Sequence, residues 1–286
     1  GDVNNDGFDD LIVGAPYADP TGISSGCSYV VFGKNSTSAV ELSSIEDGEG
    51  GGFVINGAGQ YDLSGYSVSN AGDVNNDGFD DLIVGAYSAD PNDNYTSGSS
   101  YVVFGKSSTS AVELSTIEED GGGGFVINGV DEGDQSGRSV SNAGDVNNDG
   151  FDDLIVGAFL ADPNGPTSGS AYVVFGKSST SAVELSTIET GEGDGFVING
   201  AGLNDYVGRI VSNAGDVNND GFDDLIVGSP DADPNGNNSG SSYVVFGKNS
   251  TSAVELSTIE AGEGGGFVIN GVDEADQSGF SVSNAG

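Results

Sequence analysis

The chain has 286 residues, of which 45 are Asp or Glu and only 6 are Lys or Arg, so its formal net charge is −39. This charge repels nucleic acid and anionic membrane surfaces, and it makes cations the natural partners. The sequence contains neither an apolar run of membrane-spanning length nor a basic leader followed by an apolar stretch, so we expect no membrane insertion and no retained signal peptide.

The composition is typical of a folded, turn-rich β protein, with 50 glycines, 35% hydrophobic residues and clusters of Val, Ile, Phe and Tyr. Because the chain begins at Gly1 rather than Met, we expect that it has been processed or excised. Cys27 is the only cysteine, which excludes an intrachain disulfide and a cysteine metal site. Its counterparts are serines, and we interpret Cys27 as a tolerated replacement of Ser.

The chain consists of repeats, because "GDVNNDGFDDLIVG" begins at Gly1, Gly72, Gly144 and Gly215. Each unit contains the runs "DDLIVG", "YVVFGK" and "GFVING" and ends in "SVSNAG" or, once, "IVSNAG". These runs predict four strands per unit, since they are short, β-branched and bounded by turn residues. The nearest helical candidate, "SAVELSTIE", is too short to predict a helix. The units are 1–71, 72–143, 144–214 and 215–286.

The predicted fold is an all-β propeller with four blades of about 71 residues, each of four antiparallel strands, in one domain over 1–286. Residues 11–13 and 30–32 are apolar on both strand faces, which suits a sheet packed between two others. We expect residues 281–283 to complete the sheet begun at 9–13, so that the N- and C-terminal segments share a blade. After "FVING", units one and three read Ala-Gly and units two and four read Val-Asp-Glu, which indicates an even number of blades.

The repeated loop "DVNNDGFDD" has the donor spacing of a calcium site. In the first unit it offers oxygens at Asp2, Asn4, Asp6, the Phe8 carbonyl and Asp10, which are positions 1, 3, 5, 7 and 9 of the loop. Gly7 allows the bend between them. The equivalent ligands are Asp73, Asn75, Asp77, Phe79 and Asp81; Asp145, Asn147, Asp149, Phe151 and Asp153; and Asp216, Asn218, Asp220, Phe222 and Asp224.

An EF-hand does not fit these loops, because position 12 is a valine within a predicted strand instead of a bidentate Glu. The three Asp residues assigned as ligands within nine positions repel one another unless a cation lies among them. The sequence therefore predicts about four Ca²⁺ ions per chain, which fix the strand connections and offset part of the negative charge.

The loop followed by "DDLIVGAP" in the first unit, with "YVVFGK" downstream, resembles the FG-GAP repeat of integrin α-subunit propellers and their bacterial relatives. The resemblance covers the whole chain. It implies that each calcium loop links neighbouring strands of a blade and that the protein is extracellular or exposed at the cell surface. The family commonly builds seven blades, so a four-bladed ring, an eight-bladed pair of chains and a segment of a longer array are all open.

Other repeated charges have structural interpretations. The acids of the "ADP" triplets are interpreted as turn residues, with a second cation ligand as the alternative. The acids before "SVSNAG" are interpreted as turn caps or as supports of the calcium loop, and the lysines after "FG" as paired surface charges. These sets are Asp19, Asp90, Asp162 and Asp233; Asp62, Asp134, Asp205 and Asp276; and Lys34, Lys106, Lys177 and Lys248.

The sequence does not predict an enzyme, because it has no His, no paired Cys, no G-x-S-x-G and no phosphate-binding glycine motif. The first hypothesis is an extracellular calcium-binding propeller that acts as a structural or adhesion module, alone or in a longer repetitive chain or filament. Its expected partners are calcium, other copies of itself, surface proteins or glycans. The alternative is a carbohydrate-binding module that uses the variable loops, and an acid-based glycoside hydrolase is a distant third. The variable loops are 16–28, 87–100, 159–171 and 230–242.

Overall fold

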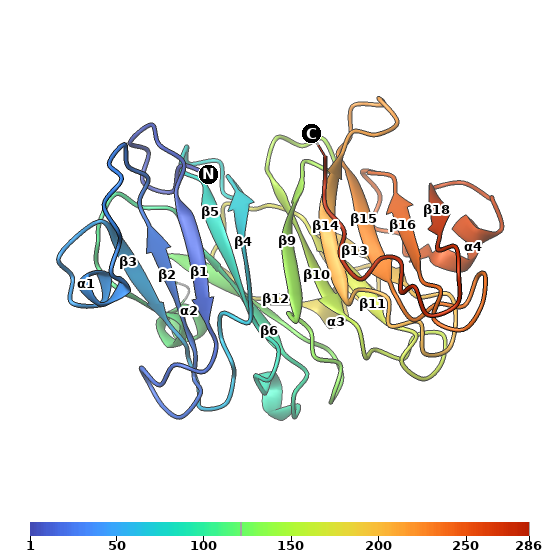
Figure 1. Cartoon of the computed structure of the whole chain (residues 1–286), viewed down its shortest axis with the longest axis horizontal. Coiled ribbons are helices and arrows are strands. Elements are labelled where there is room, and N and C mark those ends of the chain that lie inside the picture. Colours follow the sequence, from blue (N-terminus) through green and yellow to red (C-terminus); the bar gives the residue numbers. More distant parts are fainter. Residues whose placement is uncertain (121, 286) are drawn as a thin grey trace.

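The computed structural model describes residues 1–120 and 122–285, which form four β-sheets that follow one another along the chain (Figure 1). The first sheet has the order β1-β2-β3-β7 and the second β4-β5-β6-β8-β12. The third has the order β9-β10-β11-β13-β17 and the fourth β14-β15-β16-β18. Their bounds are, in the first sheet, Leu11–Ala15, Cys27–Val31, Gly52–Asn56 and Val112–Glu113; in the second, Ser67–Gly72, Asp81–Ala86, Ser99–Val103, Gly124–Asn128 and Val183–Glu184; in the third, Ser139–Gly144, Asp153–Ala158, Ser170–Val174, Gly195–Asn199 and Val254–Glu255; and in the fourth, Ile210–Gly215, Asp224–Ser229, Ser241–Val245 and Gly266–Asn270.

The predicted runs form strands in every unit, except that the last run of the fourth unit, at residues 281–285, does not. A sheet does not coincide with a sequence unit. The "SVSNAG" run of one unit is the inner strand of the next sheet, as β4 is for β5. A two-residue strand of the following unit then adds in parallel at the outer edge, as β7 does to β3. Consecutive sequence units are therefore joined by strand pairing at both edges of the sheets.

Each unit also contains a short helix that the sequence did not predict. The helices are preceded by a valine and a glutamate and contain "LSTIE" or a close variant, and Ile117 of the second is buried against the sheet. Two apolar side chains three positions apart suffice to hold one helical turn on a sheet, although the period is too short to stand out in the sequence. The helices are α1 (Leu42–Glu46), α2 (Leu114–Asp120), α3 (Leu185–Glu189) and α4 (Leu256–Glu260), and a 3₁₀ turn, η1, spans Pro91–Asp93.

The hydrophobic core lies between the blades. Three clusters of buried side chains separate the four sheets, one at each junction. All residues of β5 and β6 are buried, as the prediction of strands apolar on both faces requires. At the first junction Phe53 and Ile55 of one blade pack against Leu82 and Val84 of the next. Each blade is thus stabilised mainly by its neighbours.

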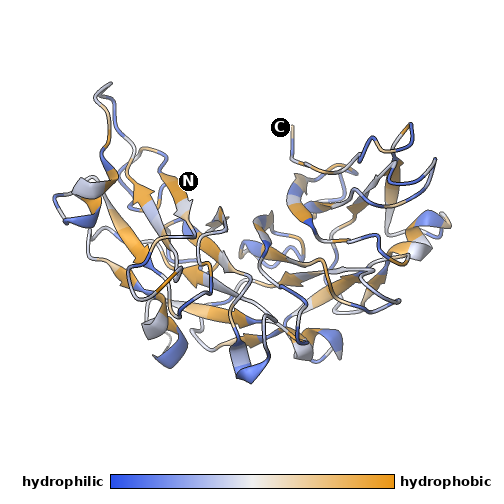
Figure 2. Ribbon diagram, turned by 60° about the horizontal axis from the view of Figure 1, so that its bottom comes forward, coloured by the Kyte–Doolittle hydropathy of each residue, from blue (hydrophilic) through white to orange (hydrophobic). Residues whose placement is uncertain are grey.

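The blades form an open arc, with the apolar strands inside and the short helices at the outer rim (Figure 2). In the part of the chain that the structure describes, β1 pairs only with β2, and residues 281–283 form no strand. The prediction that the N- and C-terminal segments share a blade is therefore not confirmed. The reason is geometric, because the first and fourth blades lie at opposite ends of the arc.

A glycine in the second strand of each blade permits the close approach of the next chain segment. A Cβ atom on Gly85 would lie 2.0 Å from the carbonyl oxygen of Gly137, which belongs to the segment leading into the next blade. The backbone amide of Gly137 in turn donates to the Gly157 carbonyl at 3.1 Å. No side chain fits between these backbones, so the glycine of "DLIVG" is required by packing.

We expect Gly85→Ala to destabilise the protein by about 1–3 kcal/mol, because the added methyl group must displace backbone atoms. Urea unfolding with and without the substitution measures the effect. Gly133 is a suitable control, since a Cβ there meets no atom within 4 Å and Gly133→Ala tests only its positive φ of 88°. An unchanged free energy of unfolding in Gly85→Ala would contradict this account of the junction.

Candidate metal-binding loops

The "DVNNDGFDD" loops link the inner strand of a blade to the next strand, as the resemblance implied. Residues 73–80 join β4 to β5, 145–152 join β9 to β10, and 216–223 join β14 to β15. The first loop precedes β1. Each loop lies at a junction between blades, so its side chains can act on two sheets at once.

The first acid of each loop organises the bend. Asp2 accepts hydrogen bonds from the backbone amides of Asp6 at 3.0 Å and Gly7 at 2.8 Å. The turn is completed by positive φ angles of 57° at Asn5 and 89° at Gly7, which Asn and Gly tolerate. The other three loops repeat both hydrogen bonds.

The asparagine at the third position has an unsatisfied side-chain oxygen. Its side-chain carbonyl oxygen is buried and has no hydrogen-bond partner in any of the four loops. A buried acceptor without a partner costs about 1–3 kcal/mol, so its recurrence at one position requires a reason. The four atoms are Oδ1 of Asn4, Asn75, Asn147 and Asn218.

The third and fifth positions converge. Asn147 Nδ2 lies 3.0 Å from Asp149 Oδ2, and Asn218 Nδ2 lies 2.9 Å from Asp220 Oδ2. In these two loops the amide nitrogen faces the carboxylate, so a cation between the two side chains would require the amide group to turn over and present its oxygen. In these two loops, two of the predicted ligands therefore lie side by side.

The acid at the ninth position faces the backbone. Asp81 accepts from Val74 N at 3.0 Å and from Gly105 N at 2.8 Å, and its counterparts make the same pair of bonds. Burial raises the pKa of Asp81 to about 7 and that of Asp153 to about 8, against the lowering effect of these amide donors. Carboxylate oxygens keep lone pairs beyond one amide bond each, so this acid can still join a cation site.

Within residues 1–120 and 122–285, no group of three or more Asp, Glu, His or Cys side chains is gathered as a ready metal site. The predicted set instead mixes carboxylate, amide and backbone oxygens, and its carboxylates are partly engaged by backbone amides. The orphaned Asn oxygen and the hard oxygen donors fit Ca²⁺, which accepts such mixed ligands in flexible geometry.

The eighth residue of the loop has a role that the sequence analysis missed. Asp80 Oδ2 accepts from the backbone amide of Asp2 in the preceding loop at 2.7 Å. Asp152 and Asp223 accept in the same way from Asp73 and Asp145, at 2.8 and 3.0 Å. The sequence signal for this role was the pair of adjacent Asp residues in each loop, because only the second of them was predicted to be a calcium ligand. These bonds connect successive loops across the blade junctions.

The four lysines were wrongly interpreted as paired surface charges. Among the described residues none of them forms an ion pair, and each ammonium donates to the carbonyl of the serine four residues on. Lys106, Lys177 and Lys248 also lie over a phenylalanine ring of the preceding blade, 4.2–4.5 Å from its centre. Burial lowers the pKa of Lys248 to about 8.

The interpretation of the other repeated acids as turn residues is confirmed. Asp19 accepts from Ser24 N at 2.6 Å, and the equivalent acids of the other units make the same type of bond. Asp62 accepts from Gly59 N at 2.7 Å, and its counterparts likewise cap the turn three residues before them. Cys27 is buried and free, in place of the serines that bond to an Asn in the other blades.

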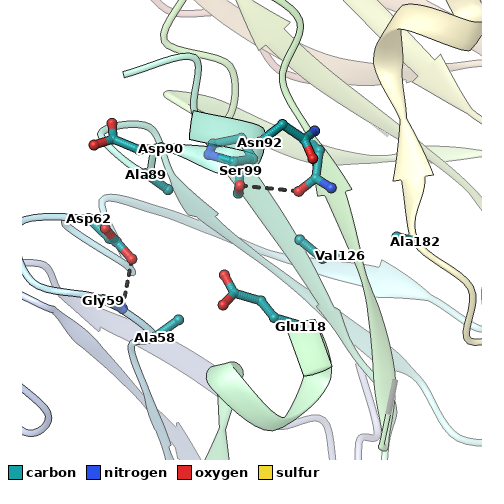
Figure 3. Close-up of a pocket in the computed structure, with 12 residues that line it drawn as sticks. Ala58, Gly59, Asp62, Ala89, Asp90, Asn92, Ser99, Glu118, Val126 and Ala182 are labelled. Atoms are coloured by element: carbon teal, nitrogen blue, oxygen red, sulfur yellow. Dashed lines mark hydrogen bonds between the residues drawn. The ribbon is translucent and has the colours of Figure 1, made fainter. Parts of the chain in front are cut away.

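Acidic pockets lie between the blades beside the variable loops. The pocket in Figure 3 has a volume of about 460 Å³, and Glu118 points into it from α2 opposite Asp62 and Asp90. Burial, followed by repulsion from Glu118 and Asp90, raises the pKa of Asp62 to about 6. A similar pocket of about 500 Å³ at the next junction contains Asp134 and Glu189.

The chain belongs to the FG-GAP repeat family. The family profile matches residues 1–40, 64–103, 136–174 and 207–245, which together are more than half of the chain. The second, third and fourth matches begin before the inner strand and end at the third strand of a blade, so they follow the sheets of the structure. The family and its resemblance to integrin α-subunits, both predicted from the repeated motifs, are confirmed.

Among curated proteins, the chain is 29% identical over 162 residues to integrin alpha-4 of Xenopus laevis, covering 56% of this chain and 14% of that protein. It is 27% identical over 295 residues to phosphatidylinositol-glycan-specific phospholipase D of Dictyostelium discoideum, covering 99% of this chain and 29% of that protein. A 90-residue match to integrin alpha-PS2 of Drosophila melanogaster is 37% identical and covers 32% of this chain and 6% of that protein. The chain thus spans less than a third of these relatives.

No helix among the described residues combines the length and apolar character needed to cross a membrane.

We expect the stability of the protein to fall between pH 5 and pH 8, and Asp134→Asn to reduce this fall by up to about 2.5 kcal/mol. Burial raises the folded-state pKa of Asp134 to about 7, with repulsion from Asp131, Glu189 and Asp162 adding to it. Because the folded state holds this proton more tightly than the unfolded state, deprotonation destabilises the fold as pH rises. Urea unfolding at both pH values in chelator measures the effect.

The matched control is Asp93→Asn, which removes an exposed carboxyl and should leave the pH dependence unchanged. If the free energy of unfolding changed equally with pH in the wild type and in Asp134→Asn, the raised pKa of Asp134 would be contradicted.

Proposed function

We propose that this chain is an extracellular, calcium-stabilised propeller region that serves as a structural or adhesion module, with about four Ca²⁺ ions per chain. The observation that carries the proposal is the buried, unpartnered Asn Oδ1 atom in each of the four loops. The same loop carries the other four oxygens predicted as ligands. In two loops the amide nitrogen of the third-position asparagine lies within 3.0 Å of the fifth-position carboxylate.

A calcium ion would act on the junctions because the loops are connected to one another. The carboxylate at the eighth position of one loop accepts a hydrogen bond from the first amide of the preceding loop. Ordering one loop therefore also fixes the position of its neighbour. At roughly millimolar calcium a site of the extracellular class adds about 0.4–1.4 kcal/mol of stability. Four sites then add about 2–6 kcal/mol, which is a large part of the stability of an ordinary domain.

The extracellular location and the adhesion role rest on the family, since several relatives are integrin α-subunits. We propose a binding or structural role and no catalysis for this region. One relative is named as a phospholipase D, but the chain spans only 29% of that protein, so its reaction is not transferred to this chain.

Asn75→Ala tests the calcium sites. We expect calorimetric titration of the chelated protein to give four calcium ions per wild-type chain and three for the variant. Because Asn75 Oδ1 makes no hydrogen bond without a ligand, its removal should leave stability in chelator unchanged or slightly higher. Asp77→Ala should also lose one ion, but it additionally removes the 3.0 Å bond to Phe79 N and should destabilise the chelated protein.

The matched control for the metal count is Asp93→Ala, which removes an exposed acid outside the loops and should still bind four ions. Absence of calcium binding at millimolar concentration in the wild type would refute the proposal. A full complement of four ions in Asn75→Ala would remove this asparagine from the ligand set.

The second candidate function, glycan binding, is favoured by the pockets beside the variable loops. Their carboxylates and the amide of Asn92 present hydrogen-bonding groups to a polar ligand in a partly enclosed space. If this function exists, a glycan array at saturating calcium should show specific binding that Asn92→Gly weakens, while the positive φ of 57° at this position is preserved. An array without binding would rule out this candidate for the glycans tested.

A further inference from the structure

The tyrosines of this chain occupy two different places. Four of the ten lie in β2, β6, β11 and β16, and three of these four are fully buried. The other six lie in segments that connect strand ends on the face of the molecule opposite the metal-binding loops. Such a distribution is typical of a binding surface, because tyrosine combines a large ring of low conformational freedom with a polar hydroxyl. The six are Tyr17, Tyr61, Tyr66, Tyr87, Tyr95 and Tyr206.

Four side chains come together on this face at the inner edge of the second and third blades. Tyr66 and Arg138 immediately precede the inner strands β4 and β9, which lie side by side (Figure 1). Tyr87 and Phe159 immediately follow β5 and β10. Because β4 pairs antiparallel with β5, and β9 with β10, all four are attached at the same ends of their strands. Both blades have a neighbouring blade on either side within this chain.

The Arg138 guanidinium lies among three aromatic rings. Its Cζ atom is 5.2 Å from the centres of the Tyr66 and Tyr87 rings and 4.9 Å from the centre of the Phe159 ring. The two tyrosine rings meet edge to face, with their centres 4.7 Å apart. Cation–ring attraction and ring packing therefore hold the arginine in place. We call these four side chains the arginine–aromatic cluster.

Arg138 has no carboxylate partner among the described residues, although the chain contains 45 Asp and Glu. The equivalent arginine of the next unit, Arg209, forms an ion pair with Asp231 at 2.9 Å. Within residues 1–120 and 122–285 the one hydrogen bond of the Arg138 guanidinium goes to Gln135 Oε1, at the long distance of 3.4 Å. A guanidinium has five N–H donors, so most of those of Arg138 remain available to a ligand.

The cluster combines groups that recognise a carboxylate next to a sugar ring. The planar guanidinium matches the two oxygens of a carboxylate, which it binds by parallel hydrogen bonds. Tyr66 is 40% exposed, so part of its ring is open to pack on the apolar C–H face of a sugar. The formal charge of −39 repels highly charged anions at a distance, whereas a ligand with a single carboxylate needs only one cation at contact.

We propose that the arginine–aromatic cluster binds a glycan that carries a carboxylate, as uronic and sialic acids do. The carboxylate pairs with Arg138, and the adjoining sugar ring packs on Tyr66. The site is separate from the acidic pockets between the blades, because none of the four side chains lines those pockets. The inference goes beyond the proposed structural role. It does not depend on the calcium sites, since the cluster and the metal-binding loops lie at opposite ends of the strands.

A glycan array tests the proposal. It displays glycans that end in a uronic or sialic acid, the methyl esters of the same glycans, neutral glycans and peptides with a free carboxylate. We expect the wild-type protein to bind acidic glycans and to bind their methyl esters about tenfold more weakly, because the ester is no longer an anionic acceptor. Titration calorimetry with the glycan that binds best measures the affinities.

Two variants test the residues. Arg138→Lys keeps the charge but lacks the planar fork, and we expect it to weaken binding about tenfold. Tyr66→Ala removes the exposed ring and should also weaken binding, whereas Tyr66→Phe keeps the ring and should retain most of the affinity. Circular dichroism checks that each variant folds. The comparison of acids with methyl esters uses the wild type alone, so it tests the proposal even if a variant does not fold.

The chain offers matched controls. Arg209→Lys changes the equivalent arginine, whose charge is already paired with Asp231, and it should bind like the wild type. Tyr95→Ala removes a 65% exposed ring in a variable loop outside the cluster and should likewise have no effect. Asn92→Gly, which tests the acidic pockets, should also leave this binding unchanged.

Equal binding of acids and methyl esters, or no binding of any acidic glycan on the array, would overturn the proposal. So would full affinity in either folded variant, Arg138→Lys or Tyr66→Ala. Binding of the peptides in place of the glycans would overturn the assignment to carbohydrate. Calcium titration of the same protein separates this site from the proposed function. Four bound ions without glycan binding would refute only the glycan site, whereas glycan binding without bound calcium would refute only the calcium sites.

Discussion

The structure depends on the burial of sheets that are apolar on both faces. A strand such as β5 has no polar face to turn toward water, so its sheet is stable only between two others. The repeat satisfies this requirement by placing the same pair of complementary faces on every blade. The hydrophobic core is consequently divided into layers between blades, and the two end layers remain open.

The edges of the blades add directional contacts to this packing. At the inner edge, Val140 N of one inner strand donates to Ser67 Oγ of the preceding one at 3.1 Å, and Val211 N donates to Ser139 Oγ at the same distance. At the outer edge, an asparagine–glutamate bond accompanies the short parallel strand. Packing alone would allow blades to slide or rotate, and these bonds fix the register in which one blade meets the next.

The acidic loops place like charges where the blades meet. Carboxylates at the first, eighth and ninth positions are engaged by backbone amides, which accommodates them without a counterion in the protein itself. The asparagine oxygen at the third position receives no such donor. Within a single loop the amide oxygen therefore supports the proposed calcium site more strongly than the number of acids does. Carboxylates accept from backbone amides, whereas the buried asparagine oxygen has no donor in the protein.

The sequence by itself determined the repeat, fifteen of the sixteen predicted strands, the family and the loop that links two strands, because each depends on local pattern and turn chemistry repeated along the chain. It did not predict the two-residue parallel strands β7, β12 and β17, whose partners lie in the preceding unit. It did not predict the short helices, since one turn held by Leu114 and Ile117 has too little periodicity to detect. The roles of Asp80 and Lys106 also escaped it, because their partners lie in another blade. Only the tertiary structure decided which face of a blade meets which, and that residues 281–283 do not close the arc in this chain, since both depend on how far apart the end blades lie in space.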